Sequence, residues 1–210
     1  MEPEGGTFVE PDRGSGTEPE TRELEAEIRT RLRLLQRAMA EQGMDLALIL
    51  QNVDLFYYTG TIQDGLLVVP ADGEPVLFVR RVLERAREES PLRDVRGYAR
   101  LQEIADYLLD TGRDTGAMGL ELDVLPAGLY LRLQDLLPHA TFQDISPLIR
   151  FQRAVKSSCE IELLAEGGRR FDRVLEAMRE EIVPGRTEYQ VYQRFVLLLL
   201  EQRSSLRVRT

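Results

Sequence analysis

The chain has 210 residues, of which 43% are hydrophobic and 30% are charged, and its formal net charge at pH 7 is -9. This length is enough for one well-cored domain and part of a second. The acidic balance, with arginines and glutamates alternating along the predicted helices, excludes the basic stripe that nucleic acid or an anionic membrane would need.

The cysteine content and the length of the apolar runs indicate the cellular compartment of the protein. One cysteine cannot form an internal disulfide, and the acidic, Gly/Pro-rich N-terminus lacks the basic and then apolar pattern of a signal peptide. The longest apolar run, Val196–Leu200, is far shorter than the roughly 20 residues of a membrane span. We therefore expect a cytoplasmic protein with neither nucleic acid nor a membrane as partner.

The N-terminal third begins with a tail and continues with a helix and a strand. Residues 1–20 are predicted to be a disordered acidic tail, because they carry too little apolar surface to offset the entropy of ordering. From Thr21, as N-cap, apolar residues recur at helical spacing as far as Met39, and Gly43 is the predicted stop. The unalternating run Leu46–Leu50 predicts a central strand covered on both faces.

A hairpin follows. Two apolar runs, Leu66–Val69 and Val76–Val79, flank a turn in which Asp72-Gly73 tolerates positive φ. Short segments then alternate between helix at 81–89, 101–109 and 126–137 and strand at 95–98, 117–121 and 141–145. The alternation predicts an α/β fold with a mixed sheet and helices on both faces.

Beyond Pro147 the pattern is purely helical. Ser157–Glu160 and Thr187–Gln190 each predict a capping box before an apolar-periodic stretch. The first of these helices is predicted to have one apolar face, formed by Ile161, Leu164, Ala165, Gly168, Phe171, Leu175, Met178 and Ile182. A boundary between Pro147 and Lys156 follows, which gives domains at 21–150 and 151–210. The second helix, Val191–Leu200, runs into a short basic tail, so its apolar face is expected to need further chain, a partner subunit or the first domain as cover. We therefore expect a fragment or a non-catalytic relative of a larger enzyme.

The residue types that carry chemistry are scarce. His139 and Cys159 are the single histidine and the single cysteine, so a histidine pair, a Cys-His pair or a thiolate cluster is excluded. We expect His139 in a loop or at a strand edge and Cys159 to be inert. No catalytic residue and no metal ligand is predicted.

Two further patterns on the C-terminal helices have structural explanations. The carboxylate pairs Glu162 with Glu166 and Glu176 with Glu180 are interleaved with arginines, which predicts a solvated face with ion pairs rather than a general acid–base pair. Gly167-Gly168 lies inside a helix, where close helix packing is a better explanation than a phosphate cradle.

Three stretches together resemble the N-terminal half of the creatinase, prolidase and aminopeptidase P family. They are Gln51–Gly60 with its Asn-x-Asp and Tyr-x-Thr-Gly elements, Leu67–Val76, and Arg153–Ile161 with its Arg-x-x-Lys-Ser-x-x-Glu-Ile pattern. Val183–Glu188 also resembles the Pro-Gly-x-x-Glu turn of that family. The resemblance, from about Thr21 to Gln202, implies a creatinase-type N-terminal domain followed by the first helices of an incomplete α+β pita-bread metallopeptidase domain.

In that family two divalent ions, often manganese or cobalt, activate a water against an Xaa-Pro bond. Their ligands lie on strands later in the chain, and no position here matches one, so the resemblance implies no cofactor in this chain. It assigns a role only to Arg153, whose counterpart lies near the substrate entrance; a domain-junction salt bridge is an equally good interpretation.

Three hypotheses remain open. The first is the N-terminal portion of an Xaa-Pro aminopeptidase or dipeptidase, which shapes substrate access and forms homo-oligomer contacts. The second is a stand-alone, non-catalytic dimerisation or peptide-binding module of the same fold. The third is a gene remnant that aggregates through the exposed helical face. For an intact relative, the substrate is either a peptide or a non-peptide amidine.

Overall fold

The computed structural model describes residues 18–204, and side chains from residue 23 onward. The predicted disordered tail lies outside the described residues except for its last three, Glu18–Glu20, which are already helical. The chain divides into two compact units between Ala154 and Val155, and each is described by itself.

The first unit is built on one six-stranded sheet with the strand order β4-β3-β2-β1-β5-β6. The strands are β1 (Leu46–Ile49), β2 (Gly65–Pro70), β3 (Val76–Val79), β4 (Asp94–Gly97), β5 (Gly116–Leu120) and β6 (Ala140–Asp144). Strand β2 is antiparallel to both β1 and β3, whereas the pairs β1–β5, β3–β4 and β5–β6 are parallel. The predicted mixed sheet, its central strand at Leu46 and its hairpin are therefore confirmed.

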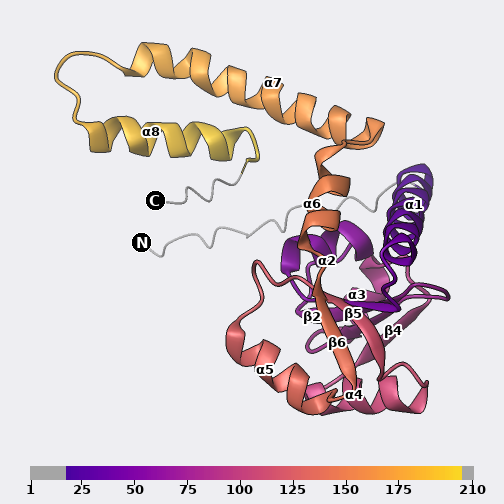
Figure 1. Cartoon of the computed structure of the whole chain (residues 1–210). Helices are drawn as coiled ribbons and strands as arrows, with labels where there is room; N and C mark the ends of the chain where they lie inside the picture. Colours follow the sequence, from indigo (N-terminus) through magenta and orange to yellow (C-terminus); the bar gives the residue numbers. More distant parts are fainter. Residues whose placement is uncertain (1–17, 205–210) are drawn as a thin grey trace, which may run out of the picture. The chain divides into compact units, whose positions relative to one another are not determined.

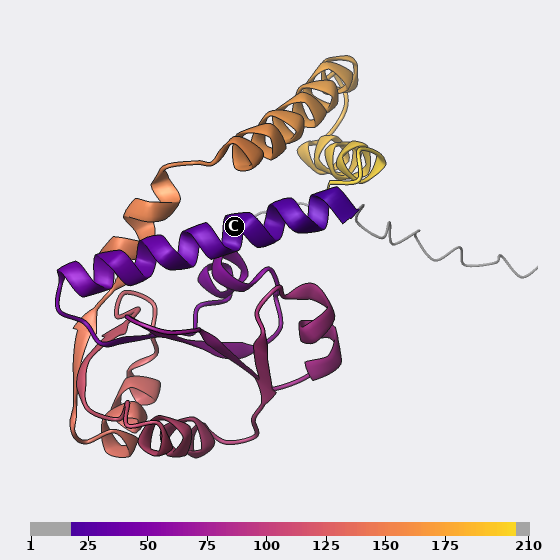
Figure 2. The ribbon, with the colours of Figure 1, turned by 90° about the vertical axis from the view of Figure 1, so that its right-hand side faces the viewer.

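Helices cover both faces of this sheet, as Figure 2 shows with α1 on one side and α4 and α5 on the other. The helices are α1 (Glu18–Glu41), α2 (Asn52–Thr59), α3 (Leu83–Glu89), α4 (Leu101–Asp110), α5 (Ala127–Leu136) and α6 (Ser146–Ala154). Apolar residues of α2, α3 and α6 join those of α1 in the core on its side.

Strand β1 shows why an unbroken apolar run is needed at the centre. Ala47 and Ile49 point into the core under α1, and Leu46 and Leu48 point into the core under α4 and α5. All four side chains are buried. Each fully buried Leu or Ile contributes about 1.5–3 kcal/mol, so both faces of the strand stabilise the sheet.

Helix α1 ends where the sequence predicts. The Met44 N–H donates to the Met39 carbonyl at 3.0 Å, which closes a Schellman-type end with Gly43 at φ 67°. Two helices of the first unit are not among the elements that the sequence predicts. They are α2, within the stretch Gln51–Gly60, and α6, which begins before Pro147 and ends the unit (Figure 1).

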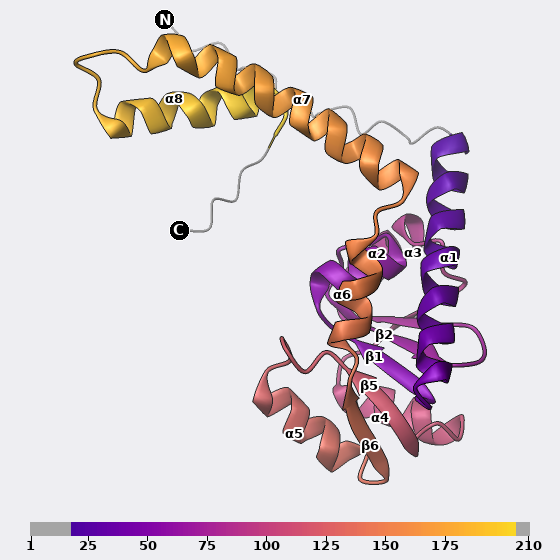
Figure 3. The same cartoon turned by 45° about the horizontal axis from the view of Figure 1, so that its top comes forward.

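The second unit is an antiparallel pair of helices, α7 (Ser158–Glu181) and α8 (Glu188–Glu201), shown side by side in Figures 1 and 3. Both predicted capping boxes are present, on Ser157 with Glu160 and on Thr187 with Gln190. No described helix has the length and apolar content that crossing a membrane would require.

The seam between α7 and α8 differs from the predicted apolar face of α7. Val174 and Met178 are buried against Leu198 and Leu199 of α8. Other residues of the predicted face are exposed, among them Ile161, Leu164 and Ile182. Within the described part of the second unit, the shorter helix α8 covers only part of the long amphipathic helix α7, so it leaves most of the predicted face uncovered.

Candidate functional site

The stretch Gln51–Gly60 folds as a short helix with both ends capped by its own residues. The Gln51 side chain accepts a hydrogen bond from the Asp54 N–H at 2.9 Å, and Gly60 ends the helix in the left-handed conformation at φ 75°. A Cβ on Gly60 would lie 3.1 Å from Ile28 Cδ1 of α1. Only glycine suits both the positive φ and this approach.

Arg153, the predicted substrate-entrance residue, pairs with this helix. Its Nη1 donates to Asp54 Oδ1 at 2.6 Å. Asp54 is buried in the first turn of α2, and the Arg153 side chain is about one-third exposed. A charge-assisted hydrogen bond of this length is among the stronger side-chain contacts in proteins. The pair fixes the end of α6 on the start of α2.

A second contact joins the same two helices next to this pair. The Tyr58 hydroxyl donates to Gln152 Oε1 at 3.0 Å, and Gln152 Nε2 donates to the Arg31 carbonyl of α1 at 2.8 Å. Burial raises the pKa of the Tyr58 hydroxyl well above its ordinary value, and the nearby Tyr57, Asp54 and Glu121 raise it further. Tyr58 is therefore a neutral hydrogen-bond donor that ties three helices together.

Glu121 adds a second carboxyl group to this cluster. It follows the last residue of β5 and is 1% exposed. Its Oε2 accepts from the backbone N–H groups of Leu50 at 2.6 Å and Gln51 at 2.9 Å, at the junction of β1 and α2. Burial raises the pKa of Glu121 to about 7; the two N–H groups oppose the rise and the neighbouring Asp54 adds to it.

Glu121 is not among the site residues predicted from the sequence. The signal for it was a charged residue directly after the apolar end of a strand, Met118–Leu120, which predicts either a strand terminus or a buried charge. Only the parallel pairing of β1 with β5 brings this residue to the start of α2. Asp54, Tyr58, Glu121 and Arg153 are hereafter called the polar cluster.

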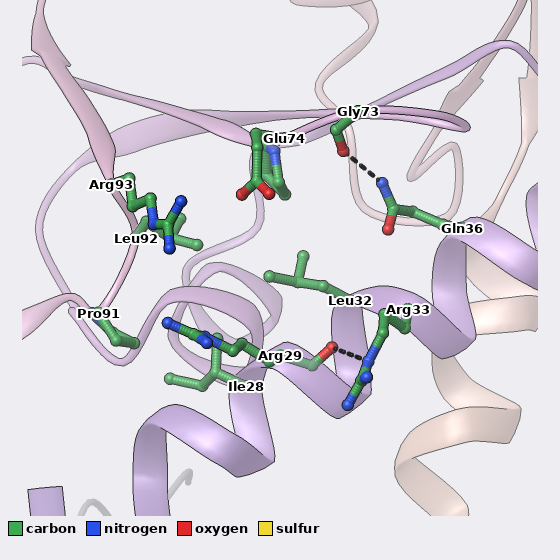
Figure 4. Close-up of a pocket in the computed structure, with 11 residues that line it drawn as sticks. Ile28, Arg29, Leu32, Arg33, Gln36, Gly73, Glu74, Pro91, Leu92 and Arg93 are labelled. Carbon is green, nitrogen blue, oxygen red and sulfur yellow. Dashed lines mark hydrogen bonds between the residues drawn. The ribbon is translucent and has the colours of Figure 1, made fainter. Parts of the chain in front are cut away.

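A separate hollow of about 200 Å³ lies between α1, the β2–β3 turn and the segment before β4 (Figure 4). Its floor contains Ile28 and Leu32, and the guanidinium groups of Arg29 and Arg93 and the Glu74 carboxylate reach toward it. The charged side chains are exposed. This volume is below the usual range of small-molecule sites, so the polar cluster is the stronger candidate.

The other sequence-predicted positions are not members of the polar cluster. His139 is exposed in a turn before β6, as predicted, and Cys159 is half-buried in the first turn of α7. Glu166 pairs with Arg169 and Arg170, and Glu176 pairs with Arg179, which confirms the solvated face with ion pairs.

Close helix packing at Gly167-Gly168 stays a prediction. A Cβ built on either glycine meets nothing within 4 Å, so no close packing requires them within the described part of the chain.

The chemistry available to the described residues is limited. Within residues 18–204, no group of three or more His, Cys, Asp or Glu side chains could hold a metal ion. The two divalent ions implied by the resemblance therefore do not fit the residues that the structure describes. The polar cluster holds carboxyl, phenol and guanidinium groups whose described contacts are with one another, with Gln152 and with backbone, which suits positioning of helices rather than bond cleavage.

Residues 31–155, more than half of the chain, match the sequence profile described as the creatinase/prolidase N-terminal domain. The chain belongs to this family. All four members of the polar cluster lie within the matched range, and Arg153 lies near its C-terminal end. The creatinase/prolidase N-terminal domain therefore covers the first unit from the middle of α1 to its end.

Individual proteins of this family resemble the chain over about half their length. An Xaa-Pro dipeptidase from Pyrococcus furiosus is 28% identical over a region that covers 78% of this chain and 46% of the dipeptidase. An ectoine hydrolase from Halomonas elongata is 29% identical over 80% of this chain and 46% of its own. The solved structure of the prolidase from Pyrococcus furiosus matches with a TM-score of 0.72 at 27% identity, over 81% of this chain and 52% of that one.

Proposed function

We propose that this chain is the N-terminal portion of an Xaa-Pro-type metalloaminopeptidase or dipeptidase, in which it shapes substrate access and forms subunit contacts. The observation that carries the proposal is the match to a creatinase/prolidase N-terminal domain at 31–155 in a chain that spans about half of its Xaa-Pro dipeptidase relatives. The catalytic ions, manganese or cobalt, would bind the remaining half. The cytoplasm is the proposed location.

Within this function Arg153 is proposed as the residue at the substrate entrance. It lies at the end of α6, immediately before the chain passes into the second unit. Asp54 holds one of its N–H groups, while about one-third of the side chain remains exposed. An anchored but accessible guanidinium suits the recognition of a peptide carboxylate. The domain-junction role is the alternative for the same residue.

The relatives leave the substrate class open, because one is named for an Xaa-Pro dipeptide and another for ectoine. A peptide is proposed because an Xaa-Pro dipeptidase and a solved prolidase are both among the proteins that this chain resembles. The test is hydrolysis of Xaa-Pro dipeptides by the native protein, recovered from its cells with an antibody to the first unit, with Mn²⁺ or Co²⁺ added.

The same preparation yields an intact mass that separates the two leading functions. A species of roughly twice 24.0 kDa that cleaves Xaa-Pro dipeptides supports the peptidase. A species of 24.0 kDa without hydrolysis supports the stand-alone module, which the exposed apolar residues of α7 favour as a dimerisation surface. Xaa-Pro hydrolysis by the pure 210-residue chain would contradict the assignment of the catalytic ions to another half.

A further inference from the structure

Glu121 has one buried oxygen atom that the described contacts leave without a partner. Its Oε2 accepts two backbone N–H groups, but Oε1 is buried and no hydrogen-bond donor in the described part of the chain reaches it. Buried polar atoms in native proteins are hydrogen-bonded in the great majority of cases. A buried carboxylate oxygen without a hydrogen bond lowers the stability of the fold more than a neutral polar atom without one.

The neighbouring carboxyl group belongs to Asp54. Its Oδ1 accepts from Arg153, so one guanidinium already serves one carboxylate. Glu121 forms no ion pair with any described residue, although it is the more deeply buried of the two groups. Two adjacent buried carboxylates with one cation leave one negative charge uncompensated. A single proton would remove this charge and provide the missing donor.

We propose that Glu121 and Asp54 share one proton, so that a hydrogen bond between their carboxyl groups locks the end of β1 and the start of α2 to Arg153. The lock joins three segments of the first unit. Oε2 of Glu121 holds the β1–α2 junction, Oε1 donates to Asp54, and Asp54 holds α6 through Arg153. Loss of the proton places two like charges together and weakens all three connections.

The other ionisable groups on the surrounding elements have different partners. On α2, the Tyr58 hydroxyl donates to Gln152, and the Tyr57 ring lies under the Arg31 guanidinium of α1. After β5, Asp123 pairs with Arg150 of α6 at 3.0 Å. At the end of β6, Asp144 accepts from the Ser146 N–H at 2.9 Å. None of these contacts places a donor on Oε1.

The direction of the pKa shift of Glu121 determines the pH range in which the lock stabilises the fold. Burial raises the pKa of Glu121 to about 7, above the ordinary carboxyl value of about 4.3. A group whose pKa is raised by folding stabilises the folded state fully below the ordinary pKa, and this contribution is lost as the pH rises to the folded-state pKa. The lock is therefore closed at about pH 5 and has lost its contribution above about pH 7.

The backbone N–H groups of Leu50 and Gln51 report on the lock directly, because both donate to Glu121. Their hydrogen exchange is measured by NMR on the 210-residue chain from about pH 5 to 8, with correction for the intrinsic exchange rate. Every protein carries His139→Gln, so that no imidazole contributes. The expected protection factor falls by up to about tenfold per pH unit below pH 7 and then levels off.

Three variants distinguish a shared proton from the burial of Glu121 alone and from the titration of another group. Glu121→Gln keeps an acceptor for the two N–H groups and offers a permanent NH₂ donor to Asp54, so its protection is expected to be independent of pH. Asp54→Asn removes the neighbouring charge and so lowers the folded-state pKa of Glu121, and its protection is expected to level off at a lower pH. Glu74→Gln, at an exposed position of the same unit, is expected to leave the slope unchanged.

Two results would overturn the proposal. A slope that persists in Glu121→Gln would assign the titration to another group. An unchanged levelling-off pH in Asp54→Asn would mean that burial of Glu121 alone accounts for the pH dependence and that no proton is shared. Near-UV circular dichroism of each variant verifies that its tertiary structure is intact at about pH 5.

Discussion

Arg153 and Asp54 are 99 positions apart in the sequence, and their side chains meet at 2.6 Å in the first unit. Each belongs to one of the stretches through which the sequence resembles creatinase and prolidase proteins. The contact shows that these two stretches form one structural feature. Helix α2, which lies within the first of these stretches, and α6, the last helix of the first unit, therefore hold each other in place.

Removal of this ion pair should destabilise the first unit. Arg153→Met leaves the buried Asp54 carboxylate without its charged donor, and we expect the free energy of unfolding to fall by about 1–3 kcal/mol. Urea denaturation at pH 7 measures the change. Arg93→Met, which removes an exposed arginine that forms no ion pair with a described residue, should alter stability by less than about 0.5 kcal/mol. Equal effects of the two substitutions would show that the ion pair with Asp54 does not stabilise the fold.

Gly60 should tolerate substitution less well than Gly43, although both have positive φ. Alanine at either position costs about 1–2 kcal/mol for the left-handed conformation. At Gly60 the new Cβ would also approach Ile28 Cδ1 at 3.1 Å, whereas at Gly43 it meets nothing within 4 Å. Thermal unfolding of Gly60→Ala and Gly43→Ala should therefore show the larger loss for Gly60. The reverse order would show that the helix contact is not crowded.

Replacement of Gly167 or Gly168 by alanine should stabilise α7. Both glycines lie inside the helix, and an added Cβ meets nothing within 4 Å. Glycine in a helix interior costs about 0.5–1 kcal/mol relative to alanine. Far-UV circular dichroism during heating should show a higher midpoint for each variant. A lower midpoint would mean that the glycines face a contact formed outside the described residues.

The exposed part of α7 should promote self-association of the 210-residue chain. Leu163 and Leu164 are 69% and 61% exposed and line one side of an open apolar hollow with Phe171. Leu164→Glu should lower the mass measured by light scattering at high protein concentration. Leu109→Glu changes a leucine of similar exposure on the first unit and serves as the control. A concentration-independent monomer mass for the unmodified chain would exclude this association.

Asp144 should contribute stability that acid removes. Burial opposes ionisation, but hydrogen bonds from the Ser146 side chain and N–H and from the Leu122 N–H outweigh it and lower the pKa of Asp144. A lowered folded-state pKa gives stability above the ordinary pKa that is lost as pH falls through the folded value. Asp144→Asn should therefore be less stable than the unmodified chain at pH 7, and the difference should shrink at about pH 3. Urea midpoints at the two pH values measure this change.

The regular elements are easier to predict from this sequence than the polar cluster. Apolar periodicity and capping residues are local signals, so the central strand at Leu46, the hairpin and the caps at Ser157 and Thr187 follow from neighbouring residues. Helix α2 is missing from the predicted elements, because its stretch is too short to show a helical period. Both of its ends, Gln51 and Gly60, nevertheless carry local capping signals.

The cluster was missed because its members come from distant segments. Glu121 reaches the start of α2 only through the parallel pairing of β1 with β5, and no local pattern specifies which strands pair. The extent of exposure on α7 was unpredictable for the same reason. Helical spacing identifies an apolar face, but the partner helix decides that Val174 and Met178 are covered while Ile161 and Leu164 are not.

The position of α6 has a consequence for the order in which the domain is made. Helix α2 lies in the first third of the chain, but its partner residues Gln152 and Arg153 are synthesised much later, 94 and 99 positions after the residues they contact. During translation from the N-terminus, the sheet strands emerge before the helix that completes their cover. The first unit can therefore complete its folding only late in synthesis, after α6 has left the ribosome and can pack on the earlier segments α1 and α2.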